Sequence, residues 1–299
     1  MPANTGAFSK YLVPGLRKVY IEEFKRYPEE YSKIFNMETS KRSYEEESIV
    51  MGLGRLERKQ EGVALTVDTG KQGGTKRFTH VTFGLQFDVT EEMWEDDLYG
   101  TMMKMSRMLS RSVMQTKELE AGLFLDDVFT GASYTGVDGQ PLCSNSHTLL
   151  IGGTFDNSGG AVDLSPGALR TGREVSESLV DERGLPIFRV PKLLIVGPQN
   201  QWVAEEVIKA QKVPYSANNE PNVTQNIMGL SYMVSHYQSD ADQWLLLPDK
   251  GEHDLKWFWR RQPKFRNWDD EKTGNASFGV TMRFSLGFTD WRGAYGGTG

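Results

Sequence analysis

Residues 79–100 read THVTFGLQFDVTEEMWEDDLYG, and the spacing of the apolar side chains changes within this stretch. Over residues 79–89, apolar side chains alternate with polar or small ones, which predicts a strand with one apolar face. Thr90 then suits a helix N-cap, and two glutamates follow it in the first turn, where carboxylates interact favourably with the helix dipole. The stretch therefore predicts a strand that leads directly into a helix.

The predicted helix continues to about residue 129, because no proline interrupts it and apolar residues recur at helical spacing. These residues are Trp94, Leu98, Met102, Met105, Leu109, Leu119 and Leu123. A helix of about 40 residues would be roughly 60 Å long. Six of the 12 methionines lie in the same segment, and methionine tolerates repacking. We expect either an ordinary core helix or a spine that allows the subunit to change shape.

A second strand with the same alternation lies near the end of the chain. Residues 278–288 place apolar side chains at every second position, as residues 81–89 do. The segment between these strands and the long helix, about residues 136–263, alternates helical and strand-like stretches. We therefore expect one sheet built from both ends of the chain, with a compact α/β domain inserted between its strands.

Two further elements precede the strand at residues 79–89. Residues 16–27 predict an amphipathic helix, which packs either on its own domain or on a neighbouring subunit. Residues 42–76 interleave lysines and arginines with glutamates, and Val63, Leu65 and Val67 alternate with other residues as in a strand. We expect a long polar β-hairpin with too little apolar content to bury itself. Such a hairpin either rests on a partner surface or moves freely in solvent.

The composition excludes several classes of protein. The 299 residues are 38% hydrophobic and 25% charged, as in ordinary globular proteins. The net charge is −6, so the chain as a whole lacks the excess of basic residues with which proteins bind DNA. The single cysteine, Cys143, excludes an internal disulfide and fits a reducing cytoplasm. No apolar run approaches the roughly 20 residues that span a bilayer, so we expect no membrane contact.

Few residues of the sequence suggest a catalytic, metal-binding or phosphate-binding site. Cys143 and His147 are four positions apart and could form a nucleophile and its base, but no third group is fixed beside them. The four histidines lack the spacing of metal ligands. Residues 70–76, GKQGGTK, lack the second glycine and the following helix of a phosphate loop.

A cluster of aromatic and basic residues lies near the end of the inserted domain. Trp257, Trp259 and Trp268 interleave with lysine and arginine over residues 260–266. Such a cluster can stack bases, but it also suits packing over a sheet or contact with a neighbouring subunit. We favour packing or an interface, because the chain is acidic overall.

Several local stretches point to one family. They are GVDGQPLCSNSH at 136–147, LSPGAL at 164–169, DERGLP at 181–186, PKLLIV at 191–196 and DWRGAYG at 290–296. Together with the order of elements, they resemble the major capsid protein of tailed bacteriophages, whose fold the encapsulins share. The front half, with residues 45–54 and DDLYG at 96–100, is most similar to the Mu-type branch of head subunits. None of these stretches is a catalytic signature.

The resemblance implies an α+β fold of the tailed-phage major capsid type. Residues 1–40 would form an N-terminal arm, and residues 41–78 an extended β-hairpin loop lying across the adjacent subunit. Residues 79–135 and 264–299 would form a peripheral domain with the spine helix at 90–129, and residues 136–263 an α/β axial domain.

The resemblance also implies self-assembly into the hexamers and pentamers of an icosahedral head shell. This shell would enclose double-stranded DNA without sequence-specific binding, in a virion assembled in the host cytoplasm. No catalytic, cofactor-binding or metal-binding residue is expected. The candidate contacts between subunits are Arg55, Arg58, Lys59, Lys71, Lys76, Arg77, Trp257 and Trp259.

Further partners and alternatives follow from the same resemblance. Because the first arm helix is expected by Leu16, a scaffold would be a separate protein. A portal is another expected partner, and a decoration protein an optional one. The alternatives are an encapsulin-like compartment, a soluble hydrolase that uses Cys143 and His147, and a phage tail or head-completion protein.

Overall fold

The computed structural model describes residues 8–90, 92–93, 96, 100–149, 152–212, 221–222, 229–269 and 275–299. The chain divides into two compact units, each assembled from separate segments. The first unit contains Met1–Glu45, Phe78–Ala121 and Trp257–Leu286. The second contains Glu46–Arg77, Gly122–Lys256 and Gly287–Gly299.

The first unit is built on a four-stranded sheet with the strand order β1-β10-β11-β4. The strands are β1 (Asn36–Thr39), β10 (Leu255–Asp269), β11 (Ala276–Phe288) and β4 (Val81–Val89). Strands β11 and β4 are antiparallel, and aromatic rings from the two strands stack: Phe87 on Phe278 at 5.6 Å and Phe83 on Phe284 at 4.9 Å between ring centroids. The predicted pairing of two alternating strands from distant parts of the chain is confirmed.

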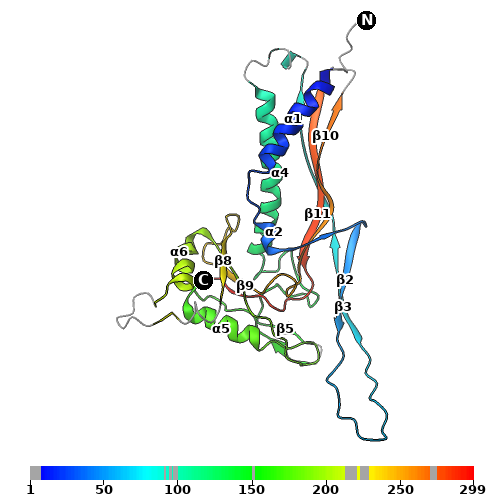
Figure 1. Cartoon of the computed structure of the whole chain (residues 1–299), viewed down its shortest axis with the longest axis vertical. Coiled ribbons are helices and arrows are strands. Elements are labelled where there is room, and N and C mark those ends of the chain that lie inside the picture. The colour runs from blue at the N-terminus through cyan, green and yellow to red at the C-terminus, as the bar shows by residue number, and fades with distance from the viewer. Residues whose placement is uncertain are drawn as a thin grey trace. The chain divides into compact units, whose positions relative to one another are not determined.

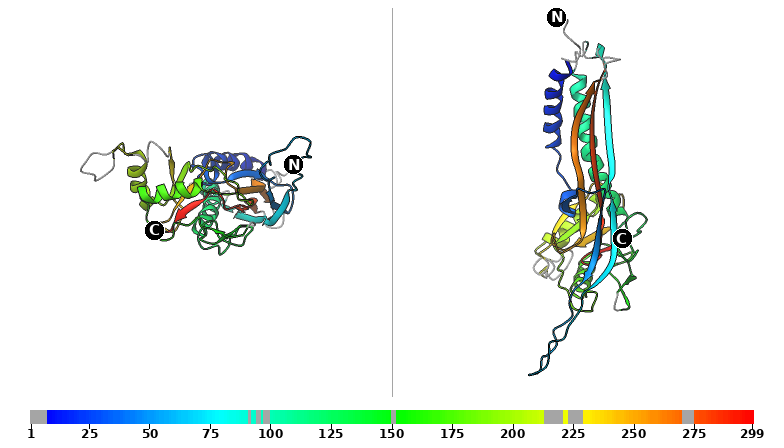
Figure 2. Two further views of the ribbon diagram at one scale, coloured as in Figure 1. Left: turned by 90° about the horizontal axis from the view of Figure 1, so that it is seen from below. Right: turned by 90° about the vertical axis from the view of Figure 1, so that its right-hand side faces the viewer.

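Two helices pack on one face of this sheet, as Figure 1 and Figure 2 show. They are α1 (Phe8–Phe24) and α4 (Thr101–Asp126), and a short helix, α2 (Tyr31–Ile34), follows α1. Leu16 of α1 and Met102 of α4 share a buried cluster with Val89 and Phe278 of the sheet. The N-terminal helix therefore packs on its own domain, which is one of the two arrangements that the sequence left open.

Helix α4 is shorter than the predicted helix over residues 90–129. The Thr90 hydroxyl accepts a hydrogen bond from the N–H of Met93 at 3.1 Å, as the predicted N-cap should. Gly100, however, has a φ of 65°, a left-handed conformation that interrupts a helix, and α4 begins only after it. Trp94 and Leu98 of the predicted stripe lie outside the described residues.

The predicted apolar stripe of α4 is only partly buried. Met102 and Leu109 are buried, but Leu119 and Leu123 are 51% and 56% exposed. The reason is that polar side chains occupy much of the buried face, where they hydrogen-bond the N-terminal segment. The Ser106 hydroxyl, for example, donates to the carbonyl oxygen of Leu16 at 2.9 Å.

The second unit contains a sheet with the order β12-β9-β7-β8. Its strands are β7 (Leu193–Val196), β8 (Ser231–Val234), β9 (Trp244–Leu247) and β12 (Tyr295–Gly297). Strands β7 and β8 are parallel, and the other two pairs are antiparallel. A two-stranded ladder joins β5 (His147–Thr148) to β6 (Thr154–Phe155).

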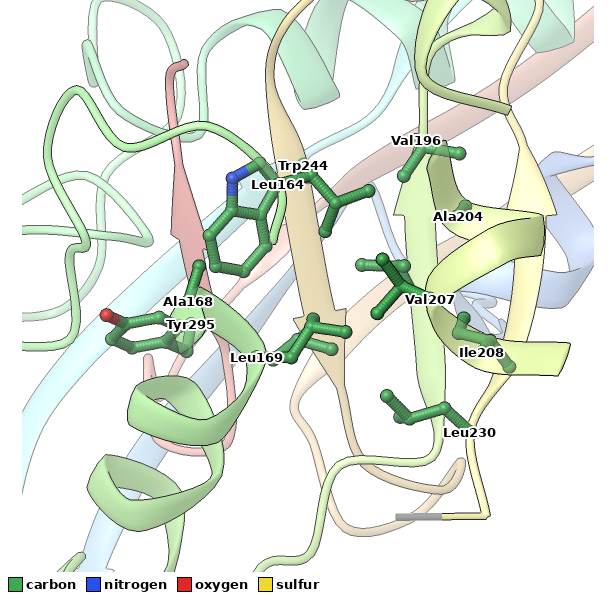
Figure 3. Close-up of a cluster of buried hydrophobic side chains, with 12 residues drawn as sticks. Leu164, Ala168, Leu169, Val196, Ala204, Val207, Ile208, Leu230, Trp244 and Tyr295 are labelled. Atoms are coloured by element: carbon green, nitrogen blue, oxygen red, sulfur yellow. The ribbon is translucent and has the colours of Figure 1, made fainter. Parts of the chain in front are cut away.

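Helices α5 (Pro166–Glu177) and α6 (Gln201–Lys209) pack on this sheet, with a 3₁₀ turn, η2 (Pro198–Asn200), before α6. The Ser165 side chain caps α5 by accepting the N–H of Ala168 at 3.2 Å, as the Ser-Pro pair predicts. In Figure 3, Leu169 of α5 and Val207 of α6 lie against the strands of this sheet, in the same buried cluster as Trp244. These contacts form the hydrophobic core of the second unit.

The extended loop is less regular than predicted. Strands β2 (Tyr44–Met51) and β3 (Lys71–Thr79) pair with each other, but residues 52–70 between them contain no strand. The strand expected around residues 63–67 is therefore wrong, because these residues have no second strand to pair with. The loop from Glu46 to Arg77 belongs to the second unit.

The C-terminal segment also belongs to the second unit. Tyr295–Gly297 pairs with Trp244–Leu247, so residues 287–299 join the α/β part of the chain. Residues 264–299 were predicted to belong to the peripheral domain together with residues 79–135. Among the described helices, none combines the length and the hydropathy that a bilayer crossing requires.

Candidate inter-subunit surface

The base of the extended loop is fixed to the rest of the second unit by buried and charged contacts. Lys256 Nζ bonds both carboxylate oxygens of Glu47 at 2.6 and 2.7 Å, and the Thr289 hydroxyl donates to the same carboxylate at 2.8 Å. On the other strand, Lys76 Nζ donates to the Thr135 hydroxyl at 3.2 Å, and burial lowers the pKa of Lys76. The loop base is therefore a rigid mount.

A glycine permits the closest of these contacts. A Cβ on Gly74 would lie 2.1 Å from Cγ1 of Val137, so no larger residue fits without moving one of the two segments. The backbone of β3 thus packs directly against the turn at residues 136–139. This close approach gives a physical role to part of the glycine-rich stretch at residues 70–74.

Asp68 closes the loop across its two arms. Its carboxylate accepts the N–H of Gly54 at 2.7 Å and also binds the guanidinium group of Arg183. Arg183 donates a second bond to the carbonyl oxygen of Thr69 at 2.9 Å. The N–H of Gly54 and the charge of Arg183 lower the pKa of Asp68, so the carboxylate stays ionised at neutral pH. We call the place where Gly54 and Asp68 hold the two arms of the loop together its neck.

Beyond this neck, residues 55–67 form the loop tip, which exposes apolar side chains. Leu56, Leu65 and Val63 are 93%, 73% and 55% exposed. Burying one such side chain is worth about 1.5–3 kcal/mol, so this surface gains stability when it meets another surface. Exposed apolar groups on a polar loop are typical of a contact site.

The predicted cationic contact residues occupy different positions on the loop. Arg55, Arg58 and Lys59 are exposed in the loop tip. Arg77, in contrast, pairs with Glu46 at 2.7 Å across β2 and β3. Lys76 is half-buried at the loop base, and the side chain of Lys71 lies outside the described part of the chain.

Trp257 and Trp259 were predicted as contact residues, and the structure corrects this prediction. Their side chains are 0% and 7% exposed. Trp257 stacks on Phe284 at 4.4 Å and contacts Tyr31 at 4.6 Å between ring centroids. Both indoles belong to the core of the first unit, because they share the face of β10 that the helices cover. Trp268, on the same strand, is 44% exposed.

The geometry around Cys143 does not make a nucleophile. The thiol is buried, and burial raises its pKa, which disfavours the reactive thiolate. His147 uses Nδ1 to bond Asp138 at 2.6 Å and stacks on Trp291 at 4.2 Å between ring centroids. Its Nε2 has no hydrogen-bond partner among the described residues. His147 therefore orders the turn at residues 136–139 and gives Cys143 no base.

Metal-ligating side chains are not gathered either. Within the described ranges, no three His, Cys, Asp or Glu side chains come close enough to hold a metal ion. Among the features described above, the loop tip and the loop base that carries it form the candidate surface for contact between subunits.

Two charged residues that support the second unit escaped the sequence analysis. Arg292 is 2% exposed, pairs with Asp290 at 3.0 Å and with Glu182 at 2.9 Å, and lies over the ring of Trp291. Asp127 accepts hydrogen bonds from the Thr130 hydroxyl and from three successive backbone N–H groups after the end of α4. No local pattern indicates the pairing of Arg292 with Glu182, because these two residues are far apart in the sequence.

Solved structures with the same fold are capsid and particle proteins. One is from Microbacterium phage Oxtober96, with a TM-score of 0.54 and 10% identity, covering 91% of this chain and 86% of that one. Another is the capsid of cyanophage P-SCSP1u, with a TM-score of 0.55, 10% identity and coverage of 91% and 88%. A virus-like particle from Pyrococcus furiosus has a TM-score of 0.52, 11% identity and coverage of 94% and 97%.

The sequence itself matches a family model. No curated protein matches the chain. The family model described as phage capsid protein matches residues 73–296, which include most of β3, the whole first-unit sheet after β1, and the α/β part of the second unit. By this match, the chain belongs to the phage capsid protein family.

Proposed function

We propose that this capsid protein forms the shell of a phage head by laying its loop tip, residues 55–67, on a neighbouring copy of itself. The observation that carries the proposal is the combination of exposed apolar side chains at the tip with a mount fixed by Glu47, Lys76 and Asp68. A rigid mount reduces the entropy that the loop loses when it binds.

Repetition of the contact makes such a shell stable. One exposed ion pair contributes at most about 1 kcal/mol, and a buried leucine about 1.5–3 kcal/mol. A closed shell repeats each contact in every subunit, so modest interactions add up to a durable assembly. Arg55, Arg58 and Lys59 would give the tip its polar rim, and the exposed leucines would form its centre.

The finer expectations about partners belong to the same proposal. The shell would consist of hexamers and pentamers that enclose double-stranded DNA, with assembly in the host cytoplasm. A scaffold protein, a portal and an optional decoration protein stay predictions. The role of the chain would be structural rather than enzymatic, which agrees with the buried Cys143 and the occupied Nδ1 of His147. An encapsulin-like compartment is distinguished by its contents, because such a shell would not protect DNA from nuclease.

The test replaces the loop tip. Because the N–H of Gly54 lies 2.7 Å from the Asp68 carboxylate, the neck is narrow enough for residues 55–67 to be replaced by a short Gly-Ser-Gly bridge. We expect the variant to fold, with an unchanged circular dichroism spectrum, and to form no shells by negative-stain microscopy and light scattering.

A matched point variant controls for general effects of charge. Leu56→Asp with Leu65→Asp should block assembly, whereas Val162→Asp, at a partly exposed apolar site on the body of the second unit, should leave it intact. Normal shells from the bridged variant would refute the proposed role of the loop.

A further inference from the structure

Six cationic side chains lie on helices α1 and α4 and on the turn that directly follows α1. They are Lys18, Lys25, Arg26, Lys104, Arg107 and Arg111, and all are exposed. Two carboxylates lie among them: Glu22, which is exposed, and Glu23, which is 4% exposed. The surface is therefore locally basic, although the whole chain has a net charge of −6. We call it the basic helix face.

Direct contacts show that the two helices form one continuous surface. The hydroxyls of Ser106 and Ser110 bond the carbonyl oxygens of Leu16 and Tyr20, so α1 runs alongside α4. Glu23 of α1 then pairs with Arg111 of α4 at 3.0 Å.

The remaining cations extend this surface along both helices. Arg26 also pairs with Glu23, at 3.3 Å. Lys104 and Arg107 precede Arg111 by seven and four residues, so helical periodicity keeps these three on one side of α4. Lys25 directly follows α1, and its N–H bonds the carbonyl oxygen of Ile21 at 3.3 Å, which continues the last helical turn from Lys18.

Most of these charges remain available. Lys25, Lys104 and Arg107 pair with no carboxylate among the residues that the structure describes. Lys18 makes only a solvent-exposed contact with Glu22 at 3.9 Å, and such contacts contribute little. Long cationic side chains without fixed partners can move to meet an irregular row of anions.

We propose that the basic helix face binds the phosphate backbone of duplex DNA. A cation that neutralises a phosphate releases a condensed counterion, which favours binding without any contact to the bases. This inference goes beyond the shell function, because a shell can close whether or not one face of its subunit contacts the genome.

The scarcity of aromatic anchors favours duplex DNA over a folded protein as the partner. Protein interfaces concentrate their binding energy in buried aromatic and apolar side chains. Over the described residues 14–27 and 101–121, the one exposed aromatic side chain is that of Tyr27, which is 38% exposed and whose hydroxyl donates to Glu23. Duplex DNA offers phosphates and no free base faces, so it requires none.

The opposite face of the same sheet provides the contrast. Phe265 of β10 contacts Tyr20 of α1 at 5.4 Å between ring centroids, so the even-numbered residues of β10 point away from the helices. There, Arg260, Lys264 and Arg266 share the surface with the exposed indole of Trp268. This mixture of arginine and an aromatic side chain is typical of a protein contact.

The test measures DNA binding by the full-length chain, kept unassembled and monitored by light scattering. Fluorescence anisotropy of a labelled duplex of about 20 base pairs, at several salt concentrations from about 50 mM upward, gives the affinity and its salt dependence. The test variant carries Lys25→Gln, Lys104→Gln and Arg107→Gln. The control variant carries Arg260→Gln, Lys264→Gln and Arg266→Gln, which removes the same charge from the opposite face.

We expect the helix-face variant to bind at least about ten-fold more weakly and to lower the slope of log K against log salt by roughly two to three. The control variant should change the affinity less than about two-fold, because its substituted residues do not contact the DNA. The result does not depend on loop-mediated assembly, since the protein is measured as a free subunit.

Three outcomes would overturn the inference. The wild-type chain could fail to bind DNA at the lowest salt concentration. The two variants could lose equal affinity, which would mean that only net charge matters. Polyglutamate could displace the DNA as well as unlabelled duplex does at equal charge, which would identify an acidic protein segment as the partner.

Discussion

Several charged or titratable side chains are buried in this protein, and His253 has the clearest consequence for its stability. Its side chain is 5% exposed. Burial, together with the positive charges of Lys250 and Arg189, lowers the pKa of His253 to about 4. The imidazole is therefore neutral in the folded chain over the whole physiological range of pH.

The sign of the linked pH dependence follows from this shift. In the unfolded chain His253 takes up a proton near pH 6.5, whereas the folded chain resists protonation until about pH 4. The second unit should therefore keep its full stability above about pH 6.5 and lose up to about 3 kcal/mol as the pH falls to 4. Urea unfolding between pH 4 and 8 measures this loss.

A pair of variants isolates the contribution of His253. His253→Gln keeps an acceptor for the N–H of Leu255, which the imidazole Nδ1 accepts at 3.3 Å, and should flatten the pH dependence. His236→Gln, at an exposed histidine of the same unit, should leave it unchanged. An equally steep loss of stability in His253→Gln would show that other groups cause it.

The tryptophans and arginines show how far residue type alone predicts a site. Arg55 and Arg58 were predicted as contact residues from the polar character of their segment, and their exposure is compatible with that role. Trp257 and Trp259 were misassigned, because an aromatic side chain on a strand suits an interface and a core equally well. Only the pairing of β10 with β11, which brings Trp257 against Phe284, decides between the two.

At the scale of elements, helix α4 shows why hydrophobic periodicity can mislead. The face of α4 that is buried in the first unit carries Ser106, Ser110, Lys117 and Glu118, all 3% exposed or less. Glu118 accepts the N–H groups of Glu30 and Tyr31, both at 3.0 Å. A periodicity argument assigns such polar residues to solvent, so the predicted stripe was displaced toward Leu119.

Among the buried polar residues of α4, Lys117 is the one whose substitution should lower the stability of the protein most. Its Nζ lies 2.8 Å from Glu29 and 4.7 Å from the ring centroids of both Phe24 and Tyr31. Lys117→Ala would leave a cavity and remove the charge that both rings face. We expect a loss of about 2–5 kcal/mol, measured by urea unfolding, because truncating a fully buried side chain leaves a cavity and removes its packing contacts.

The location of faster hydrogen exchange distinguishes the loss of the Lys117 contacts from a general destabilisation of the chain. Hydrogen exchange should become faster in α1 and α2, because the buried polar residues of α4 contact the backbone of this N-terminal segment. Lys117→Met, which keeps the volume, should lose less, because Glu29 is partly exposed and can be solvated. Lys104→Ala, at an exposed site of the same helix, should change stability by less than about 0.5 kcal/mol. Unchanged exchange in α1 of Lys117→Ala would contradict this account.

The strands were predicted more successfully than the helix for a physical reason. Each residue of β4 faces a partner in β11, so the alternation at residues 81–89 matches that at residues 276–284 position by position. The length of α4, in contrast, depends on the left-handed Gly100, and a lone glycine in a helical pattern does not reveal its φ angle.

At the scale of the whole molecule, the order of elements identified the family, but the division into units depends on contacts that no local pattern encodes. Both the loop at Glu46–Arg77 and the last segment at Gly287–Gly299 belong to the second unit, because their partners lie within Gly122–Lys256. Ion pairs such as Lys256 with Glu47 span some two hundred residues of sequence. The loop is thus mounted on the α/β part of its own subunit, and its tip remains free for another one.

A free tip on a rigid mount predicts how defective subunits act in a mixture. A chain with residues 55–67 bridged offers no tip, but it still presents the surface that receives one, so it should enter shells together with wild-type chains. If each subunit in a ring of six needs the tip of its neighbour, a tenth of bridged chains leaves only about half of the rings complete. Shell yield in such mixtures, measured by sedimentation, should therefore fall much faster than the fraction of variant rises.

Mixtures with Val162→Asp provide the control and should assemble normally. If the yield falls only in proportion to the bridged chain, that chain is merely excluded from shells, and the tip then acts within its own subunit rather than on a neighbour.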